Sequence, residues 1–172
     1  MIEKSTIEKV LEIFFEHPES EFYLRELSRK LKLSMPTIVS ATDKLSKEGL
    51  IIKTKGKALT IVTPNRENHD FIRKKRVFNL EKLYNSGILD CLIPKYNNPK
   101  LIILFGSYSR GEDTEKSDVD IALITSKKMD LSLKIYEKEL KRPINIHELN
   151  LEKISQDFRA NLCNGIVLEG SW

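Results

Sequence analysis

Two short apolar runs constrain the fold of this chain most, because each predicts a buried strand and each borders distinctive polar residues. Residues 101–105 form the first run, which ends at Gly106-Ser107, and Asp118-Val119-Asp120 opens the second run, residues 121–124. Their length and their β-branched members are typical of buried strands. Side chains alternate along a strand, so Asp118 and Asp120 point the same way and Val119 faces the other side. The sequence therefore predicts two carboxylates that converge.

The converging carboxylates predict a cation site. Like charges held this close repel each other unless a cation neutralises them, which favours a hard divalent ion with oxygen ligands, and Mg²⁺ is the natural candidate. Gly106 lets the backbone approach a phosphate without a Cβ in the way, and Ser107 can donate a hydrogen bond to a phosphate oxygen. A helix that starts after them presents N–H groups and a positive dipole end. A nucleoside triphosphate fits these features.

The segment Gly106-Ser107-Tyr108-Ser109-Arg110-Gly111, separated by five residues from Ser117-Asp118-Val119-Asp120, resembles the signature of minimal nucleotidyltransferases in the DNA polymerase beta-like superfamily. The resemblance implies a small mixed sheet with flanking helices over roughly residues 86 to 170. It also implies that Gly106 and Ser107 hold the triphosphate and that Asp118 and Asp120 bind Mg²⁺. Arg110 either meets a phosphate or pins the loop to an acidic neighbour.

Members of this superfamily usually have a third carboxylate on a later strand, where it completes the metal site and helps to deprotonate the attacking hydroxyl. Residues 143–149 are expected to form that strand, and Asn145 stands at the matching position. An amide oxygen can ligate a cation, but it brings no charge and cannot act as a base near neutral pH. His147, on the same strand face, either replaces the missing base or is structural. Glu148 lies on the opposite face.

Three apolar stripes at helical spacing predict three helices near the start of the chain. Ser5 or Thr6 can cap the first helix, and Ser34 with Pro36 begins the third. Gly49 offers a left-handed position at the end of the third helix, and residues 50–53 and 58–63 can pair as strands. The stripes are Ile7, Val10, Leu11 and Phe14, then Leu24, Leu27 and Leu31, then Ile38, Ala41, Thr42 and Leu45.

The order helix, helix, helix, hairpin over residues 1–64 resembles winged helix-turn-helix domains. The resemblance implies that the third helix enters the major groove of double-stranded DNA and that the hairpin touches the DNA backbone. Short polar side chains suit base edges, and lysines suit phosphates. The candidate DNA-binding residues are Thr37, Ser40, Lys44 and Lys47 on the third helix and Lys53, Lys55 and Lys57 on the hairpin. The alternative is a protein-docking or dimerisation unit with a lysine-rich surface.

A connecting helix is expected over residues 65–85 and the nucleotidyltransferase-fold domain over residues 86–172, which makes the fold class α+β. Residues 1–76 carry 16 Lys and Arg against 11 Asp and Glu, whereas residues 77–172 carry 13 against 14. This surplus slightly favours a polyanion as the partner of the first half. The basic run at residues 73–76 can touch nucleic acid, although a run this short is more often a solvated helix face.

The composition predicts a globular cytoplasmic protein without a membrane partner. The longest apolar runs fall far short of the roughly 20 residues that cross a bilayer, and residues 1–5 lack the apolar stretch of a signal peptide. Cys91 and Cys163 lack the paired spacing of a zinc site, so both are expected to be reduced and structural.

Two functions agree with these features. The first is an enzyme with a DNA-binding domain that uses Mg²⁺ to transfer a nucleoside monophosphate from a triphosphate to a hydroxyl acceptor, and the retained Asp118 and Asp120 favour it. The second is a DNA-binding transcriptional regulator, or an antitoxin-like partner of a toxin protein, whose nucleotidyltransferase domain only binds a nucleotide or a partner. Asn145 and the winged helix favour this second function. Winged-helix DNA readers are commonly dimers, so a homodimer is expected.

Overall fold

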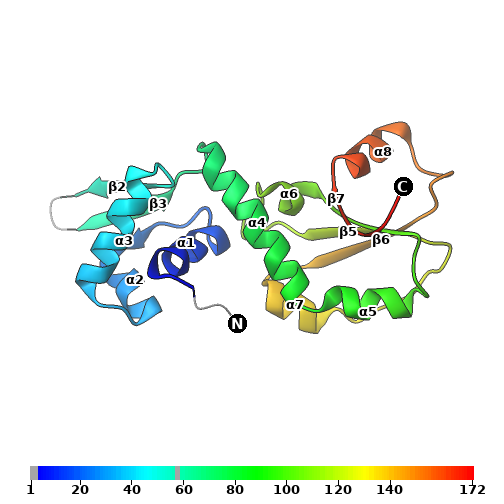
Figure 1. The fold of residues 1–172 in the computed structure, drawn as a ribbon, viewed down its shortest axis with the longest axis horizontal. Helices are drawn as coiled ribbons and strands as arrows, with labels where there is room; N and C mark the ends of the chain where they lie inside the picture. The colour runs from blue at the N-terminus through cyan, green and yellow to red at the C-terminus, as the bar shows by residue number, and fades with distance from the viewer. Residues whose placement is uncertain (1–3, 57–58) are drawn as a thin grey trace. The chain divides into compact units, whose positions relative to one another are not determined.

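The computed structural model describes residues 4–56 and 59–172. The chain divides into two compact units, residues 1–75 and residues 76–172, and the boundary lies inside one long helix, α4 (His69–Asn85; Figure 1). The helix predicted over residues 65–85 is therefore present, and it begins at His69. None of the described helices is long and apolar enough to cross a membrane.

The three helices predicted for the first unit are present. A capping box begins α1 (Thr6–Glu16): the Ser5 hydroxyl accepts from the backbone N–H of Glu8, and the Glu8 carboxylate accepts from that of Ser5. Helix α2 spans Leu24–Leu31, and Ser34 caps α3 (Met35–Lys47). Gly49 follows α3 with a φ of +73°, which is the left-handed conformation expected there.

The apolar stripes of these helices form the core of the first unit. The side chains of Val10, Phe14, Leu27, Ile38 and Leu45 are fully buried, which confirms the inward faces predicted from their spacing. Burying one such side chain contributes about 1.5 to 3 kcal/mol to folding. The spacing of the stripes thus accounts for how the three helices pack.

A three-stranded antiparallel sheet completes the first unit. Strands β2 (Ile51–Lys55) and β3 (Thr60–Pro64) form the hairpin that the sequence predicts, with Pro64 as its last residue. The third strand, β1 (Phe22–Tyr23), pairs with β3 and gives the order β1-β3-β2. Two residues are too few to show an alternation, so the sequence does not reveal β1.

The second unit contains a four-stranded mixed sheet in the order β6-β5-β4-β7. Its strands are β4 (Leu101–Phe105), β5 (Val119–Ile124), β6 (Ile144–Leu149) and β7 (Ile166–Gly170). The β5–β6 pair is parallel, and β4 is antiparallel to both β5 and β7. The predicted α+β class with a mixed sheet is confirmed, including the strand expected over residues 143–149.

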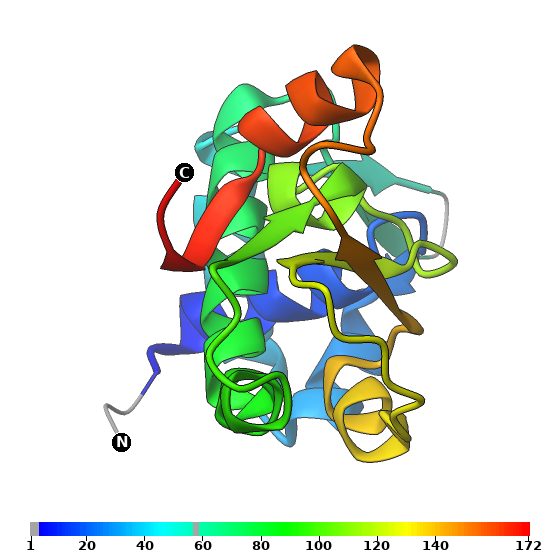
Figure 2. The ribbon, with the colours of Figure 1, turned by 90° about the vertical axis from the view of Figure 1, so that its right-hand side faces the viewer.

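Helices cover both faces of the mixed sheet (Figure 2). On one face α5 (Ile88–Lys95) and α7 (Lys134–Leu140) pack over the larger apolar cluster, which includes Leu92, Leu140 and Ile121. On the other face Leu162 of α8 (Gln156–Cys163) packs over a smaller cluster that includes Ala122. Both cysteines are free thiols, with Cys91 partly buried and Cys163 exposed.

A buried polar cluster holds the segment between β4 and β5. The side-chain amide of Asn79, on α4, donates to the backbone oxygen of Tyr108 at 2.9 Å and to Oδ1 of Asp113 at 2.7 Å. The guanidinium of Arg142 lies 3.6 Å from the other oxygen of Asp113. Asp113 and Arg142 are both buried, so these contacts act in a medium of low dielectric. They fix the loop that precedes Asp118.

Candidate active site

The candidate site lies at one end of the mixed sheet, where β4 ends and β5 and β6 begin. Asp120 is opposite Phe105, the last residue of β4, and opposite Asn145, near the start of β6. Asp118 directly precedes β5. The antiparallel and parallel pairings together therefore bring three separate segments of the chain to this point.

The alternation expected from the sequence is confirmed along β5. Val119 and Ile121 are fully buried in the larger apolar cluster, whereas Ala122 belongs to the smaller cluster on the opposite face. Asp120 shares the face of Ala122, which is the face that α8 partly covers. Both Asp118 and Asp120 are partly exposed, so their carboxylates stand at the open edge of this face.

Asn145 contacts both carboxylates of the pair, and His147 contacts that of Asp120. The amide nitrogen of Asn145 lies 2.9 Å from Oδ2 of Asp118 and 3.4 Å from Oδ1 of Asp120. Nε2 of His147 lies 3.1 Å from the same Oδ1 of Asp120. An ionised carboxylate can only accept hydrogen bonds, so Asn145 presents its N–H groups and His147 presents Nε2–H. Where a third carboxylate is expected on β6, this protein therefore has two side chains that donate hydrogen bonds to the carboxylates, Asn145 and His147.

Aromatic rings surround His147. Its ring centroid lies 5.0 Å from that of Phe105 and 6.4 Å from that of Phe158, and the two phenylalanine rings are 5.7 Å apart. Phe158, on α8, was not predicted near the site, because the sequence does not show where α8 packs. Phe105 could have been placed there, since it ends the first apolar run directly before Gly106.

Gly106 lies against the carboxylate of Asp120. Its φ is +76°, and a Cβ built on it would lie 2.6 Å from Oδ2 of Asp120. Real Cβ atoms do not approach an oxygen so closely, and the left-handed conformation already disfavours other residues. From the sequence, the glycine is expected to let the backbone approach a phosphate. In the structure, a larger residue would also collide with the carboxylate of Asp120.

Ser107 and Arg110 lie on α6 (Gly106–Arg110), a single helical turn. The turn is too short for a strong dipole, because the macrodipole sums over many aligned peptide units. The Ser109 hydroxyl donates to the backbone oxygen of Gly106 at 2.8 Å, which closes the turn. Arg110 donates through Nε to Glu112 at 2.7 Å, which matches the alternative that it pins the loop to an acidic neighbour.

Glu148 faces the other side of β6, as the sequence predicts. Its carboxylate accepts a hydrogen bond from the Tyr96 hydroxyl and another, at 2.7 Å, from the backbone N–H of Met129. Burial and the bond to Glu148 raise the pKa of the Tyr96 hydroxyl. Glu148 thus binds the segments that contain Tyr96 and Met129, and its carboxylate points away from Asp118 and Asp120.

The residues at this end of the sheet fit a hard divalent cation. Two carboxylates supply oxygen ligands and a charge that one Mg²⁺ neutralises, and both side chains are partly exposed. Within residues 4–56 and 59–172, no cluster of three or more His, Cys, Asp or Glu side chains could hold a metal ion. Asp118 and Asp120 would therefore hold the ion without a third carboxylate.

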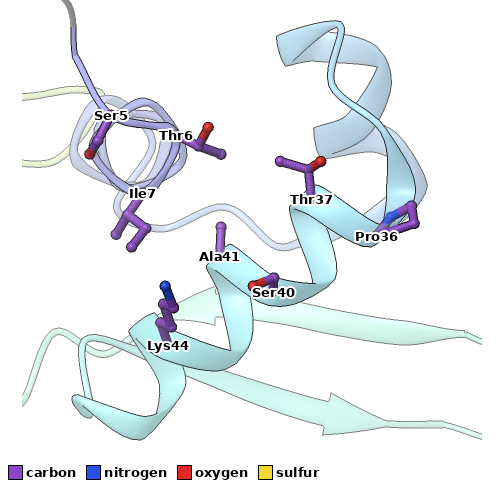
Figure 3. Close-up of a pocket in the computed structure, with 8 residues that line it drawn as sticks. All are labelled: Ser5, Thr6, Ile7, Pro36, Thr37, Ser40, Ala41 and Lys44. Atoms are coloured by element: carbon purple, nitrogen blue, oxygen red, sulfur yellow. The ribbon is translucent and has the colours of Figure 1, made fainter.

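The candidate DNA-binding residues of α3 occupy different environments. Thr37 is partly buried, and its hydroxyl lies 2.7 Å from that of Ser34 at the helix cap. Ser40, Lys44 and Lys47 are exposed. Thr37, Ser40 and Lys44 line a hollow of about 520 Å³. Figure 3 shows that it lies between α3 and the start of α1.

The lysines expected on the hairpin also differ. Nζ of Lys53 lies 2.6 Å from Oδ1 of Asp43 and 3.1 Å from Oγ1 of Thr42, and only 13% of its side chain is exposed. Lys55 is exposed, and Lys57 lies outside the described residues. Lys53 is therefore already neutralised by Asp43, which leaves Lys55 as the more available cation.

The basic run at residues 73–76 lies within α4 and does not form a single solvated face. Lys75 is fully buried, whereas Arg73 is exposed and pairs with Asp70 at 3.2 Å. The run thus contributes fewer accessible charges than its sequence indicates.

Residues 89–170 match the family model described as Polymerase beta, Nucleotidyltransferase. The match begins in α5 and ends with β7, so it includes the whole mixed sheet and all the residues of the candidate site. It supports the nucleotidyltransferase superfamily and nucleotidyl transfer as the general activity of the second unit. No curated protein and no solved structure matches the chain.

Proposed function

We propose that this protein uses its nucleotidyltransferase domain, residues 89–170, to transfer a nucleoside monophosphate from a nucleoside triphosphate to a hydroxyl acceptor with Mg²⁺. The acceptor oxygen forms a bond to the α-phosphorus, pyrophosphate leaves, and the hydroxyl proton passes to solvent. The observation that carries the proposal is the convergence of Asp118 and Asp120 beside Gly106.

Each site residue has a role in this proposal. Asp118 and Asp120 hold Mg²⁺, which neutralises charge on the triphosphate, and Gly106 and Ser107 form the phosphate-binding turn. His147 donates through Nε2 to Asp120, so it orients that carboxylate and does not offer this nitrogen as a base. Asn145 cannot act as a base either. Positioning and charge neutralisation therefore supply most of the acceleration.

Labelled triphosphates test this function. The protein is incubated with each of the four α-³²P-labelled ribonucleoside triphosphates, Mg²⁺ and cell extract, and transferred label is then sought in protein, RNA and small-molecule fractions. Label should appear with the parent protein and be absent with Asp118→Asn. Extract without the protein gives the background. Label above this background that appears equally with the parent and with Asp118→Asn contradicts the assignment.

The first unit supports a second function, binding of double-stranded DNA. The exposed Ser40, Lys44 and Lys47 on α3 and the exposed Lys55 on the hairpin are the residues that carry this proposal. Together with Asn145, they favour a regulator whose nucleotidyltransferase domain binds a nucleotide without transferring it. Such a regulator would bind both duplex DNA and Mg-triphosphate, yet it would transfer no label in the experiment above.

A further inference from the structure

The hydrogen bonds of Asn145 and His147 reach two of the four carboxylate oxygens of the site. The amide nitrogen of Asn145 contacts Oδ2 of Asp118 and Oδ1 of Asp120, and His147 contacts that same Oδ1 of Asp120. The remaining oxygen of Asp120, Oδ2, is directed toward Gly106, since it is the atom that a Cβ on Gly106 would meet. Among the described residues this Oδ2 accepts no hydrogen bond, whereas the oxygens that face β6 accept hydrogen bonds from N–H donors.

We propose that this site binds one divalent cation together with the triphosphate, and that the Asn145 amide takes the place of a second cation. The proposal rests on the proposed function of the site. It assigns the cation to the Gly106 side, where Oδ2 of Asp120 is available. Asn145 remains a hydrogen-bond donor to both carboxylates while the cation is bound.

The ligands of the protein support a single cation. The triphosphate supplies oxygen ligands to an ion bound beside it, so a further ion depends on the oxygen ligands that the protein adds. Enzymes that bind two divalent ions about 3.5 to 4 Å apart clamp both the attacking and the leaving oxygen, and hard ions of this kind need anionic oxygen ligands. No third carboxylate reaches the pair among the described residues. On the β6 side, the only protein oxygen that a second cation could add to the shared carboxylates is the neutral oxygen of Asn145, whose N–H groups would first have to turn away.

Asn145 is thus a positioning residue. Asp120 and Asn145 are direct neighbours across the parallel β5–β6 pair, so the amide is held against the carboxylates by the strand register. Its N–H groups offset the repulsion between Asp118 and Asp120 before the cation binds. The carboxylates consequently keep one arrangement in the metal-free and metal-bound protein.

Counting bound Mn²⁺ tests this inference without measuring transfer. The full chain is dialysed against Mn²⁺ and a mixture of the α,β-methylene analogues of ATP, GTP, CTP and UTP, and Mn²⁺ retained per chain is measured. Electron paramagnetic resonance then reports whether retained ions are magnetically coupled. The parent should retain one uncoupled Mn²⁺. Asn145→Asp should retain two coupled ions, while Asn97→Asp, which adds the same charge at an exposed position before β4, should retain one.

The possible outcomes separate this inference from the function on which it rests. Two coupled ions in the parent overturn the single-cation proposal but leave the proposed function standing. No retained Mn²⁺ in the parent overturns both. One ion in both the parent and Asn145→Asp overturns the role given to Asn145. The number of Mn²⁺ ions that the parent retains tests the single-cation proposal even if Asn145→Asp fails to fold.

Discussion

The amide nitrogen of Asn145 lies 2.9 Å from Oδ2 of Asp118, which joins the start of β6 to the residue just before β5. The same nitrogen is 3.4 Å from Oδ1 of Asp120, so one side chain bridges two carboxylates. A bridge of this kind stabilises the carboxylate pair without adding charge. The site of this protein therefore has two acidic residues and Asn145, where three acidic residues are usual in the superfamily that its sequence resembles.

Removing either carboxylate charge should abolish Mg²⁺-dependent triphosphate binding. Asp118→Asn and Asp120→Asn keep the side-chain volume, and the free energy of unfolding should hold or rise slightly because the repulsion between the carboxylates is relieved. Calorimetric titration with Mg-triphosphate should detect no binding by either variant. Glu139→Gln, an exposed acid on α7, is the control and should bind as the parent does. Undiminished binding by either site variant would show that the metal-site assignment is wrong.

Gly106→Ala should lose triphosphate binding because the new Cβ displaces Asp120. Gly87→Ala is a matched control, since Gly87 has a φ of +74° but a Cβ there would lie 3.7 Å from its nearest neighbour. Both variants should lower the free energy of unfolding by about 1 kcal/mol through backbone strain. Only Gly106→Ala should also weaken binding, measured by the same titration. Equal binding by the two variants would mean that Asp120 tolerates the extra methyl group.

The core of the candidate site could be predicted from the sequence because its signals are local. Strand β4 is an unbroken apolar run, and the alternation along β5 alone places Asp118 and Asp120 on one face. The strand that carries Asn145 and His147 was also predicted, because the resemblance gave the expected position of the third carboxylate. The inferences about β4 and β5 need only neighbouring residues, whereas the one about β6 also needs the resemblance.

The rest depends on contacts between distant segments. The pairing of Lys53 with Asp43 follows from how the hairpin packs on α3, and the bond between Tyr96 and Glu148 joins residues that are 52 positions apart. Strand β1 is too short to show a period, and the packing of Phe158 against His147 requires the position of α8. No local pattern encodes such contacts.

Tyr96→Phe should destabilise the second unit at neutral pH by about 1 to 2 kcal/mol, because Glu148 loses a donor in a buried setting. The pKa of Tyr96 is raised in the folded protein. The stabilisation that its hydroxyl provides is therefore fully present below about pH 10, the usual pKa of tyrosine, and is lost as the pH rises beyond it. Urea unfolding at pH 7 and pH 10.5 should show that the difference from the parent shrinks at the higher pH. Tyr84→Phe, at an exposed tyrosine, should match the parent at both.

Lys44 should contribute more to DNA binding than Lys53 does. Each phosphate contact adds about 0.9 to the slope of log affinity against log salt, so Lys44→Gln should reduce the slope by about that amount. Lys53→Gln should change it less, because Asp43 already neutralises Lys53. Asp43→Asn releases Lys53 and should increase the slope. Binding of the full chain to duplex DNA is measured by fluorescence anisotropy from 50 to 200 mM salt. No binding at low salt would favour the protein-docking alternative for this unit.

The last prediction concerns the residue that replaces the third carboxylate. If the domain transfers nucleotides, Asn145→Asp should increase the rate about tenfold or more, because it adds an anionic ligand and a base beside Asp120. His147→Ala should lower the rate, because Asp120 loses the donor that orients it. Initial rates with the acceptor identified by labelling measure both effects.

A thermal melt gives a second readout for these variants. Without Mg²⁺, Asn145→Asp replaces a donor by a third negative charge, so its melting temperature should fall, and Mg²⁺ should restore it. If the domain is a nucleotide sensor, neither change creates turnover, although the Mg²⁺-dependent shift in melting temperature persists. Robust transfer by the parent that responds to neither change would show that the third site does not lie on β6. The base would then have to be sought elsewhere, and since Glu148 is bound to Tyr96 and Met129, the C-terminal segment would be the place to look.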